Sequence, residues 1–169
     1  SVVNALSDRL DVEITRDKQI WKQSYAFGIP LAKPINTGKT SNKRGTSISF
    51  HADTQIFGNQ AHFQPKIIYR MARSKAYLFR DVEIRWSCAE KLIKGDDAPP
   101  AKATLHFPGG LADYLDSTLE DRKTLTHKNF AGEAKLNGSG GKAEWAIAWP
   151  IDELEYFKSY CNTVPTPLG

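Results

Sequence analysis

The chain has 169 residues, 25% of them charged, and a formal net charge of +4, which is enough length to bury one large core or two small ones. It contains no apolar run of membrane-spanning length and no charged-then-apolar leader, so we expect a soluble, cytoplasmic protein. Its two cysteines, Cys88 and Cys161, lack metal-ligand spacing and a pairing pattern, which argues against a disulfide framework.

Charge is divided unevenly along the sequence. Residues 1–95 contain 16 Lys and Arg against 8 Asp and Glu, whereas residues 96–169 contain 7 against 11. A reversal of sign indicates two units with different surroundings, although solubility alone also favours a charged surface. The basic half leaves open a non-enzymatic module that binds a polyanion.

The first residues are predicted to form a helix. Val2, Ala5, Leu6 and Leu10 recur at helical spacing, and Ser1 stands where the N-terminal cap would be. A helix start gathers unpaired N–H groups that attract anions, so Ser1 is either a plain cap or part of a phosphate site.

Residues 11–27 are predicted to form a β-hairpin around a turn at Asp17-Lys18. Alternation places Val12, Ile14 and Arg16 on one face of the first strand. Arg16 therefore ends an apolar face, either with its head in water or as a cation at the rim of a pocket.

Residues 44–50 also alternate with period two, after a predicted irregular basic loop over residues 30–44. The alternation predicts a strand whose buried face carries Thr46, Ile48 and Phe50. The Thr46 hydroxyl needs a partner, which is either a neighbouring main chain or a ligand. In adjacent antiparallel strands Arg16 and Thr46 would reach the same end of one sheet face, so we expect both to border one concavity.

A helix is predicted over residues 62–79. Its inward face is expected to hold Phe63, Ile67, Ile68, Met71, Ala72 and Leu78. Lys66, Arg70 and Arg73 form an outward basic stripe, which is either solvated or in contact with phosphates.

The rest of the chain is predicted to alternate strands with one further helix. A strand is expected over residues 81–86, a linker or long hairpin loop over 94–100, and an amphipathic helix over 111–120. Asp96 and Asp97 invite a metal interpretation, but nothing nearby in the sequence completes a site.

The glycine-rich run at residues 136–143 lacks the first glycine of a phosphate-binding loop, so we interpret it as a hairpin turn. The strand that follows places Trp145, Ile147 and Trp149 on one face, and a last strand is predicted over residues 154–160. No catalytic triad or metal-ligand set can be assembled, which leaves a two-part α+β chain with at most part of a ligand pocket.

Several segments together resemble the B subunit of bacterial type IIA DNA topoisomerases, in order and in spacing. They are residues 1–7, Arg44-Gly45-Thr46, residues 107–111 with Tyr114-Leu115, and residues 159–162 with Pro165-Thr166. Asn129–Gly132 followed by Glu144-Trp145-Ala146 resembles the topoisomerase IV branch more than the gyrase branch. The resemblance covers nearly the whole chain.

The resemblance implies an α+β fold in two parts, which we expect to have separate cores divided near residues 96–100. Residues 1–97 would be the C-terminal portion of a GHKL-type ATPase domain, entered just after its glycine-rich ATP lid. Residues 98–169 would be the N-terminal portion of a transducer domain with a ribosomal S5 domain 2-like fold. We also expect the chain to be a piece of something longer, because its only Met is at position 71.

The same resemblance assigns roles to four residues. Thr46 would help to hold the adenine end of ATP, and Ile48 would line the same pocket. Arg16 would stand at the pocket mouth, where aminocoumarin inhibitors dock, and Ser1 would begin the helix that follows the phosphate-binding lid.

ATP and Mg²⁺ are the cofactors that the resemblance implies for the intact enzyme. The glutamate that activates water, the magnesium asparagine and the adenine-reading aspartate would lie upstream, and the γ-phosphate lysine downstream. We therefore expect no catalytic or metal-binding residue in this segment, no tight cofactor binding, and no ATP hydrolysis by the chain alone.

The implied partners are the A subunit of topoisomerase IV, DNA, and a second copy of the B subunit that joins when ATP binds, in the bacterial cytoplasm at the nucleoid. The sequence departs from the family at Lys18, where a turn glycine is common, and at Ala52, where a proline is usual. Another GHKL ATPase, such as a MutL-type repair protein, and the basic binding module remain as alternatives.

Overall fold

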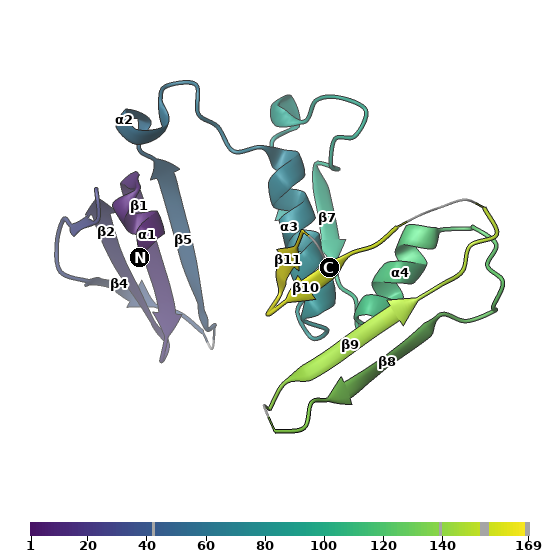
Figure 1. The fold of residues 1–169 in the computed structure, drawn as a ribbon. Helices are drawn as coiled ribbons and strands as arrows, with labels where there is room; N and C mark the ends of the chain where they lie inside the picture. The colour runs from purple at the N-terminus through teal and green to yellow at the C-terminus, as the bar shows by residue number, and fades with distance from the viewer. Residues whose placement is uncertain (42, 139, 153–155, 168–169) are drawn as a thin grey trace. The chain divides into compact units, whose positions relative to one another are not determined.

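A computed structural model describes residues 1–41, 43–138, 140–152 and 156–167 (Figure 1). Contacts between residues divide the chain into two compact units, residues 1–62 and residues 63–169. Within the described ranges, none of the helices has the length and apolar character needed to cross a bilayer.

The first unit is an antiparallel sheet with two short helices. Its elements are α1 (Val2–Ala5), β1 (Ser7–Arg16), β2 (Gln19–Ala26), β3 (Ile29–Pro30), β4 (Ile35–Lys39), β5 (Gly45–Ala52) and α2 (Thr54–Phe57). The strand order is β3-β2-β1-β5, and β4 also pairs with β2. The sheet therefore places β1 at its centre, between the hairpin partner β2 and the later strand β5.

The predicted hairpin is confirmed by the pairing of β1 with β2, which runs from Leu10 opposite Tyr25 to Arg16 opposite Gln19. Its turn residues Asp17 and Lys18 have φ of 52° and 62°. Two successive left-handed residues give the mirror-image turn whose twist matches that of the strands. Lys18 adopts this left-handed conformation although it is not a glycine. Its departure from the family pattern therefore affects only the geometry of this turn.

The two faces of this sheet differ in chemistry. On one face, Ser24 Oγ donates to Asp11 Oδ1 at 2.6 Å, and Lys22 forms an ion pair with Glu13 at 2.9 Å. These are cross-strand pairs on neighbouring strands, which stabilise a sheet without burying it. The other face carries the buried Leu10, followed along β1 by Val12 and Ile14.

Two predictions for this unit are wrong. The opening helix ends at Ala5, because the residues from Ser7 onward pair as strand β1. Leu10 therefore lies in this strand and not in the helix. The segment predicted as an irregular loop contains β3 and β4, which pair with β2. Proline and glycine are unfavourable in strands, so the sequence of these segments did not indicate them. Both segments are strands because they pair with β2.

In its described residues, the second unit contains two α-helices, one 3-10 helix and three antiparallel strand pairs. Its elements are α3 (Pro65–Leu78), β6 (Ile84–Ser87), η1 (Glu90–Leu92), β7 (Lys102–Leu105), α4 (Leu111–Leu119), β8 (Phe130–Lys135), β9 (Lys142–Ile147), β10 (Ser159–Cys161) and β11 (Val164–Thr166). Strands β6 and β7, β8 and β9, and β10 and β11 pair antiparallel.

Both predicted helices and the glycine-rich hairpin turn between β8 and β9 are confirmed. The strand predicted over residues 81–86 begins only at Ile84. The strand predicted over residues 154–160 begins at Ser159, and residues 153–155 lie outside the described ranges.

The core of the second unit forms where α3 packs against α4, β6 and β7. Its buried apolar and aromatic residues are Ala76, Tyr77, Leu105, Tyr114 and Leu119. The predicted inward face of α3 is therefore wrong in part, because Ile67 and Met71 remain 58% and 57% exposed. Helical periodicity of apolar residues did not reveal that Tyr77 is the residue that meets α4.

The division into compact units falls between His62 and Phe63 rather than near residues 96–100, where two separate cores were expected. Helix α3 causes this, since it packs on β6, β7 and α4. The assignment of residues 1–97 and 98–169 to two family domains is a different statement, and it stays a prediction.

Gly110 sets the turn that leads into α4. Its φ is +67°, and an added Cβ would lie 2.6 Å from Arg80 Nε and 2.8 Å from Glu144 Oε1. Arg80 Nη2 donates to Glu144 Oε1 at 2.6 Å, so the ion pair occupies the space beside the glycine. The lack of a side chain at Gly110 thus lets the turn lie against the ion pair that joins Arg80 to Glu144 of the hairpin β8–β9.

We expect Gly110→Ala to destabilise the chain by more than about 1 kcal/mol, because it adds both backbone strain and a clash. Gly138→Ala is the matched control, since Gly138 has φ +84° but nothing within 4 Å of an added Cβ. Urea unfolding of the two variants distinguishes the cost of the clash beside Gly110 from the cost of placing alanine at a positive φ. Equal losses of stability would show that the Arg80 contact is irrelevant.

Candidate functional site

The register of β1 and β5 brings three of the predicted site residues to one sheet face. Thr46 lies opposite Ile14, and Ile48 lies opposite Val12. Directly opposed residues of an antiparallel pair share a face, and Arg16 shares it because it is two residues after Ile14. Arg16, Thr46 and Ile48 therefore lie on one sheet face, with Thr46 between the other two along the strand direction.

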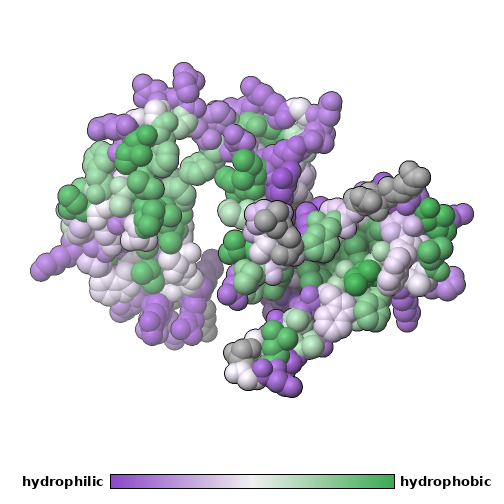
Figure 2. Space-filling view, viewed as in Figure 1, coloured by the Kyte–Doolittle hydropathy of each residue, from purple (hydrophilic) through white to green (hydrophobic). Residues whose placement is uncertain are grey.

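This face is open rather than buried. Ile48 is 60% exposed and Phe50 is 44% exposed, so the predicted burial of that face is wrong for this chain. The Thr46 hydroxyl makes no side-chain hydrogen bond to any described residue. Figure 2 shows further apolar side chains on the surface of this unit around α1, where Val2 is 73% exposed.

Arg16 and Ser1 make only local contacts. Arg16 Nε lies 3.5 Å from Asp17 Oδ2, with both side chains largely in solvent. Ser1 Oγ accepts a hydrogen bond from the Asn4 amide at 3.4 Å, as the cap of the four-residue helix α1. In the described part of the chain, no hydrogen bond links Ser1 to the other three predicted site residues.

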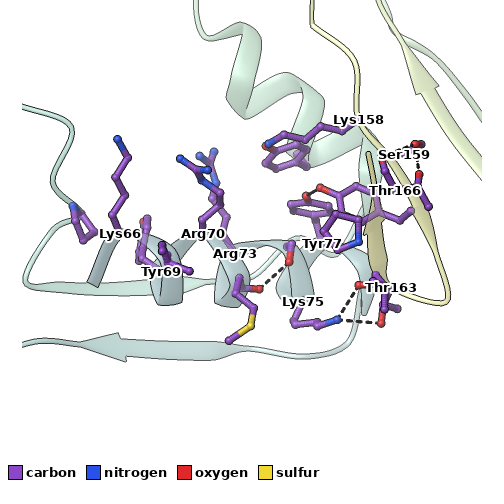
Figure 3. Close-up of a pocket in the computed structure, with 18 of the residues that line it drawn as sticks. Lys66, Tyr69, Arg70, Arg73, Lys75, Tyr77, Lys158, Ser159, Thr163 and Thr166 are labelled. Carbon is purple, nitrogen blue, oxygen red and sulfur yellow. Dashed lines mark hydrogen bonds between the residues drawn. The ribbon is translucent and has the colours of Figure 1, made fainter. Parts of the chain in front are cut away.

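A second candidate site lies within residues 63–169, and sequence reasoning did not find it. It is a groove of about 1200 Å³ between one side of α3, the segment 97–100 and the segment 157–167 (Figure 3). The basic stripe of Lys66, Arg70 and Arg73 lines it. We call this feature the α3 groove.

Tyrosines and a lysine form the end of the α3 groove. Tyr77 stacks on Tyr114 with ring centroids 3.8 Å apart, and its hydroxyl is hydrogen-bonded to that of Tyr160. Tyr114 Oη is 2.6 Å from Tyr156 Oη and accepts from Lys158 Nζ at 3.0 Å. Each phenol thus combines an apolar ring contact with a satisfied hydroxyl.

These contacts shift the pKa values in opposite directions. Burial, followed by the hydrogen bond to Tyr160, raises the pKa of Tyr77. Burial also acts to raise the pKa of Tyr114, but the hydrogen bonds with Lys158 and Tyr156 outweigh it and lower that pKa. Burial acts to lower the pKa of Lys158, but its hydrogen bonds to the two phenols outweigh that effect and raise it.

Neither candidate site has the ligands of a metal centre. Among the residues that the structure describes, no three His, Cys, Asp or Glu side chains are grouped to hold an ion. Cys88 and Cys161 are both free thiols. The chemistry on offer is therefore recognition by hydroxyl, cationic and aromatic groups.

Comparison with known proteins shows what the chain is similar to. No protein-family model matches it. It is 44% identical over 169 residues to the B subunit of DNA topoisomerase 4 from Bartonella bacilliformis and 46% identical over 173 residues to that from Caulobacter vibrioides. Each match covers 100% of this chain and 24% of the relative.

Over its whole length the chain is similar to a segment of the B subunit of bacterial type IIA topoisomerases. It spans about a quarter of the length of these topoisomerase IV relatives. The resemblance stated from the sequence, including the preference for the topoisomerase IV branch, is confirmed.

Solved structures of this family have the same fold. The ATP-binding domain of Francisella tularensis topoisomerase IV, in complex with a small-molecule inhibitor, matches with a TM-score of 0.71 and 26% identity over 99% of this chain and 42% of that one. The ATPase domain of Thermus thermophilus gyrase B, in complex with an aminocoumarin, matches with a TM-score of 0.77 and 24% identity over 97% of this chain and 42% of that one. The predicted α+β fold, part of a GHKL-type ATPase region, is confirmed.

We expect Thr46→Ala to cost less than about 0.5 kcal/mol of stability, because the exposed Thr46 hydroxyl makes no hydrogen bond to the described residues that the variant would lose. Leu10→Ala in the adjacent strand should cost about 2–5 kcal/mol, since Leu10 is 5% exposed. Thermal unfolding of both variants tests the contrast. A large loss for Thr46→Ala would mean that its hydroxyl is a structural group.

We also expect Tyr114 to ionise before Tyr77 and Tyr156 as the pH rises, because it alone among them has a lowered pKa. Lys158→Met removes the cation and should move the Tyr114 transition to higher pH. Ultraviolet titration of tyrosinate absorbance measures this, with Tyr114→Phe as the control that deletes the transition. An unchanged titration in Lys158→Met would contradict the contact.

Proposed function

We propose that the protein containing this chain is an ATP-dependent DNA topoisomerase that relaxes and decatenates DNA, and that this chain is part of its ATPase and transducer region. The observation that carries the proposal is the match to B subunits of topoisomerase IV along the entire chain, at 44–46% identity. The same match disfavours a MutL-type repair protein and a non-enzymatic basic module.

The β1–β5 face is proposed as the adenine side of the ATP site. Thr46 would bond the adenine end, Ile48 would pack beside it, and Arg16 would stand at the mouth, where an aminocoumarin would dock. The shared face and the unpaired, exposed Thr46 hydroxyl support this arrangement. Ser1 would follow the phosphate lid, with Mg²⁺ held by residues outside this chain.

The proposed mechanism is a population shift. ATP would be contacted by the ATPase portion, residues 1–97, and by the transducer portion that begins at residue 98, so it binds the closed arrangement more tightly than the open one. Closure would join two B subunits and act on DNA held by the A subunit of topoisomerase IV, in the bacterial cytoplasm. The packing of α3 on α4 and β7 supports a connection between the two portions.

The test uses the full-length protein together with the A subunit of topoisomerase IV. Thr46→Ala should raise the KM for ATP by about tenfold while leaving kcat within about twofold, because one hydrogen bond to the ground state is lost. Decatenation of linked DNA circles should fall in parallel at low ATP and recover at high ATP. An unchanged KM would show that Thr46 does not bind ATP. The absence of ATP-dependent decatenation by the full-length protein would contradict the proposed function.

We expect the 169-residue chain alone to hydrolyse no ATP, since positioned acid–base groups cannot be replaced by a pocket wall. A coupled phosphate-release assay on purified chain, with a chelator as control, measures this. Sustained chelator-sensitive turnover would show that the general base and the magnesium ligand lie inside the chain.

A further inference from the structure

We propose that the α3 groove binds an extended peptide segment, from a partner protein, that carries acidic and apolar side chains in alternation. This inference concerns only residues 63–169 and does not depend on the nucleotide site. It rests on three properties of the groove: its size, its uncompensated positive charge, and the apolar surface between the cations.

The size of the groove favours a length of chain over a small molecule as its occupant. Its volume of about 1200 Å³ exceeds the ~300–1,000 Å³ of small-molecule pockets. It runs along α3 from Lys66 to Tyr77 and is walled by residues of segments 97–100 and 157–167. A length of chain fills a space of this shape better than a compact ligand does.

Positive charge in the groove exceeds negative charge. Among the described residues, its lining contains five cations, Lys66, Arg70, Arg73, Lys75 and Lys158, and one carboxylate, that of Asp97. Only Lys66 pairs with that carboxylate, at 2.7 Å, and the Asp97 side chain is 84% exposed. A pair in solvent compensates little charge.

The other four cations have neutral partners or none. Lys75 Nζ donates to Thr163 O at 2.7 Å, and Lys158 Nζ donates to a phenol. Arg73 Nη2 donates to Ser117 Oγ at 3.0 Å, and its guanidinium lies 5.1 Å from the Tyr114 ring centroid. Arg70 forms no hydrogen bond or ion pair with the described residues, and its charge acts only at longer range, by helping Lys66 to lower the pKa of Asp97. A concave surface with this balance attracts an anion.

Spacing favours an extended chain with acidic groups at alternate positions. Figure 3 shows Lys66, Arg70 and Arg73 extending from α3 toward the same side as Lys158. One helical turn separates Lys66 from Arg70 by about 6 Å along the axis. Alternate side chains of an extended peptide are about 6.6 Å apart, so two successive acidic residues can reach two of these cations.

Apolar surface between the cations favours a peptide over a nucleic acid. Ile67 and Met71 face solvent on α3 at 58% and 57% exposure, and Val164 and Phe157 are 61% and 80% exposed. All four line the groove. Phosphates would use the cations but leave these aliphatic groups uncovered, whereas leucine-like side chains would cover them.

The experiment measures fluorescence anisotropy of a short labelled peptide of alternating glutamate and leucine, titrated with the full-length protein that contains this chain. Arg70→Glu should weaken binding by at least about tenfold, the effect of losing one charge-assisted hydrogen bond. Lys91→Glu is the matched control, with the same change of charge on an exposed lysine of η1 outside the groove, and should change binding by less than about twofold. Ile67→Ser should weaken binding several-fold without altering net charge.

Three results would overturn the proposal. Equal loss with Arg70→Glu and Lys91→Glu would mean non-specific attraction by net charge. Binding of an oligothymidylate as tight as that of the peptide, unaffected by Ile67→Ser, would mean that the groove reads phosphates. Self-association of the chain in sedimentation, abolished by Arg70→Glu, would mean that a second copy occupies the groove. Circular dichroism of each variant establishes that the fold is retained.

Discussion

The stack of Tyr77 on Tyr114 is the contact on which the second unit depends. The rings lie 3.8 Å apart and join α3 to α4, and both residues are buried. Their hydroxyls reach outward to Tyr160 and Tyr156, which draws the C-terminal segment against the helices. Buried aromatic rings supply apolar area, and their hydroxyls require partners, so one pair of residues organises both packing and polar connections. The α3 groove exists because this segment is held there.

Much of the fold could be predicted from local sequence because alternation and turn chemistry act over a few residues. The hairpin around Asp17 and the β5 strand followed from period-two patterns, and α4 followed from helical spacing. Strands β3 and β4 could not be predicted, because their pairing is supplied by β2 and their own residues do not favour strands. The orientation of α3 also failed, since a tyrosine decided which side is buried.

The two candidate sites also differ in how far the sequence could predict them. Arg16 and Thr46 share a face because two strands alternate in register, which the sequence predicts once the strands are known to be neighbours. The roles given to those residues came from family resemblance. The α3 groove requires Lys75 and Thr163 to meet across 88 positions of sequence. Spacing along one helix showed the basic stripe but carried no information about the segment that faces it.

Strand β5 ends the order β3-β2-β1-β5 in the described part of the first sheet. Its outer backbone N–H and C=O groups therefore have no strand beside them, and its apolar residues Ile48 and Phe50 are 60% and 44% exposed. An open edge of this kind is a template for pairing with another chain. For the chain handled by itself, this edge therefore favours pairing between copies of the chain.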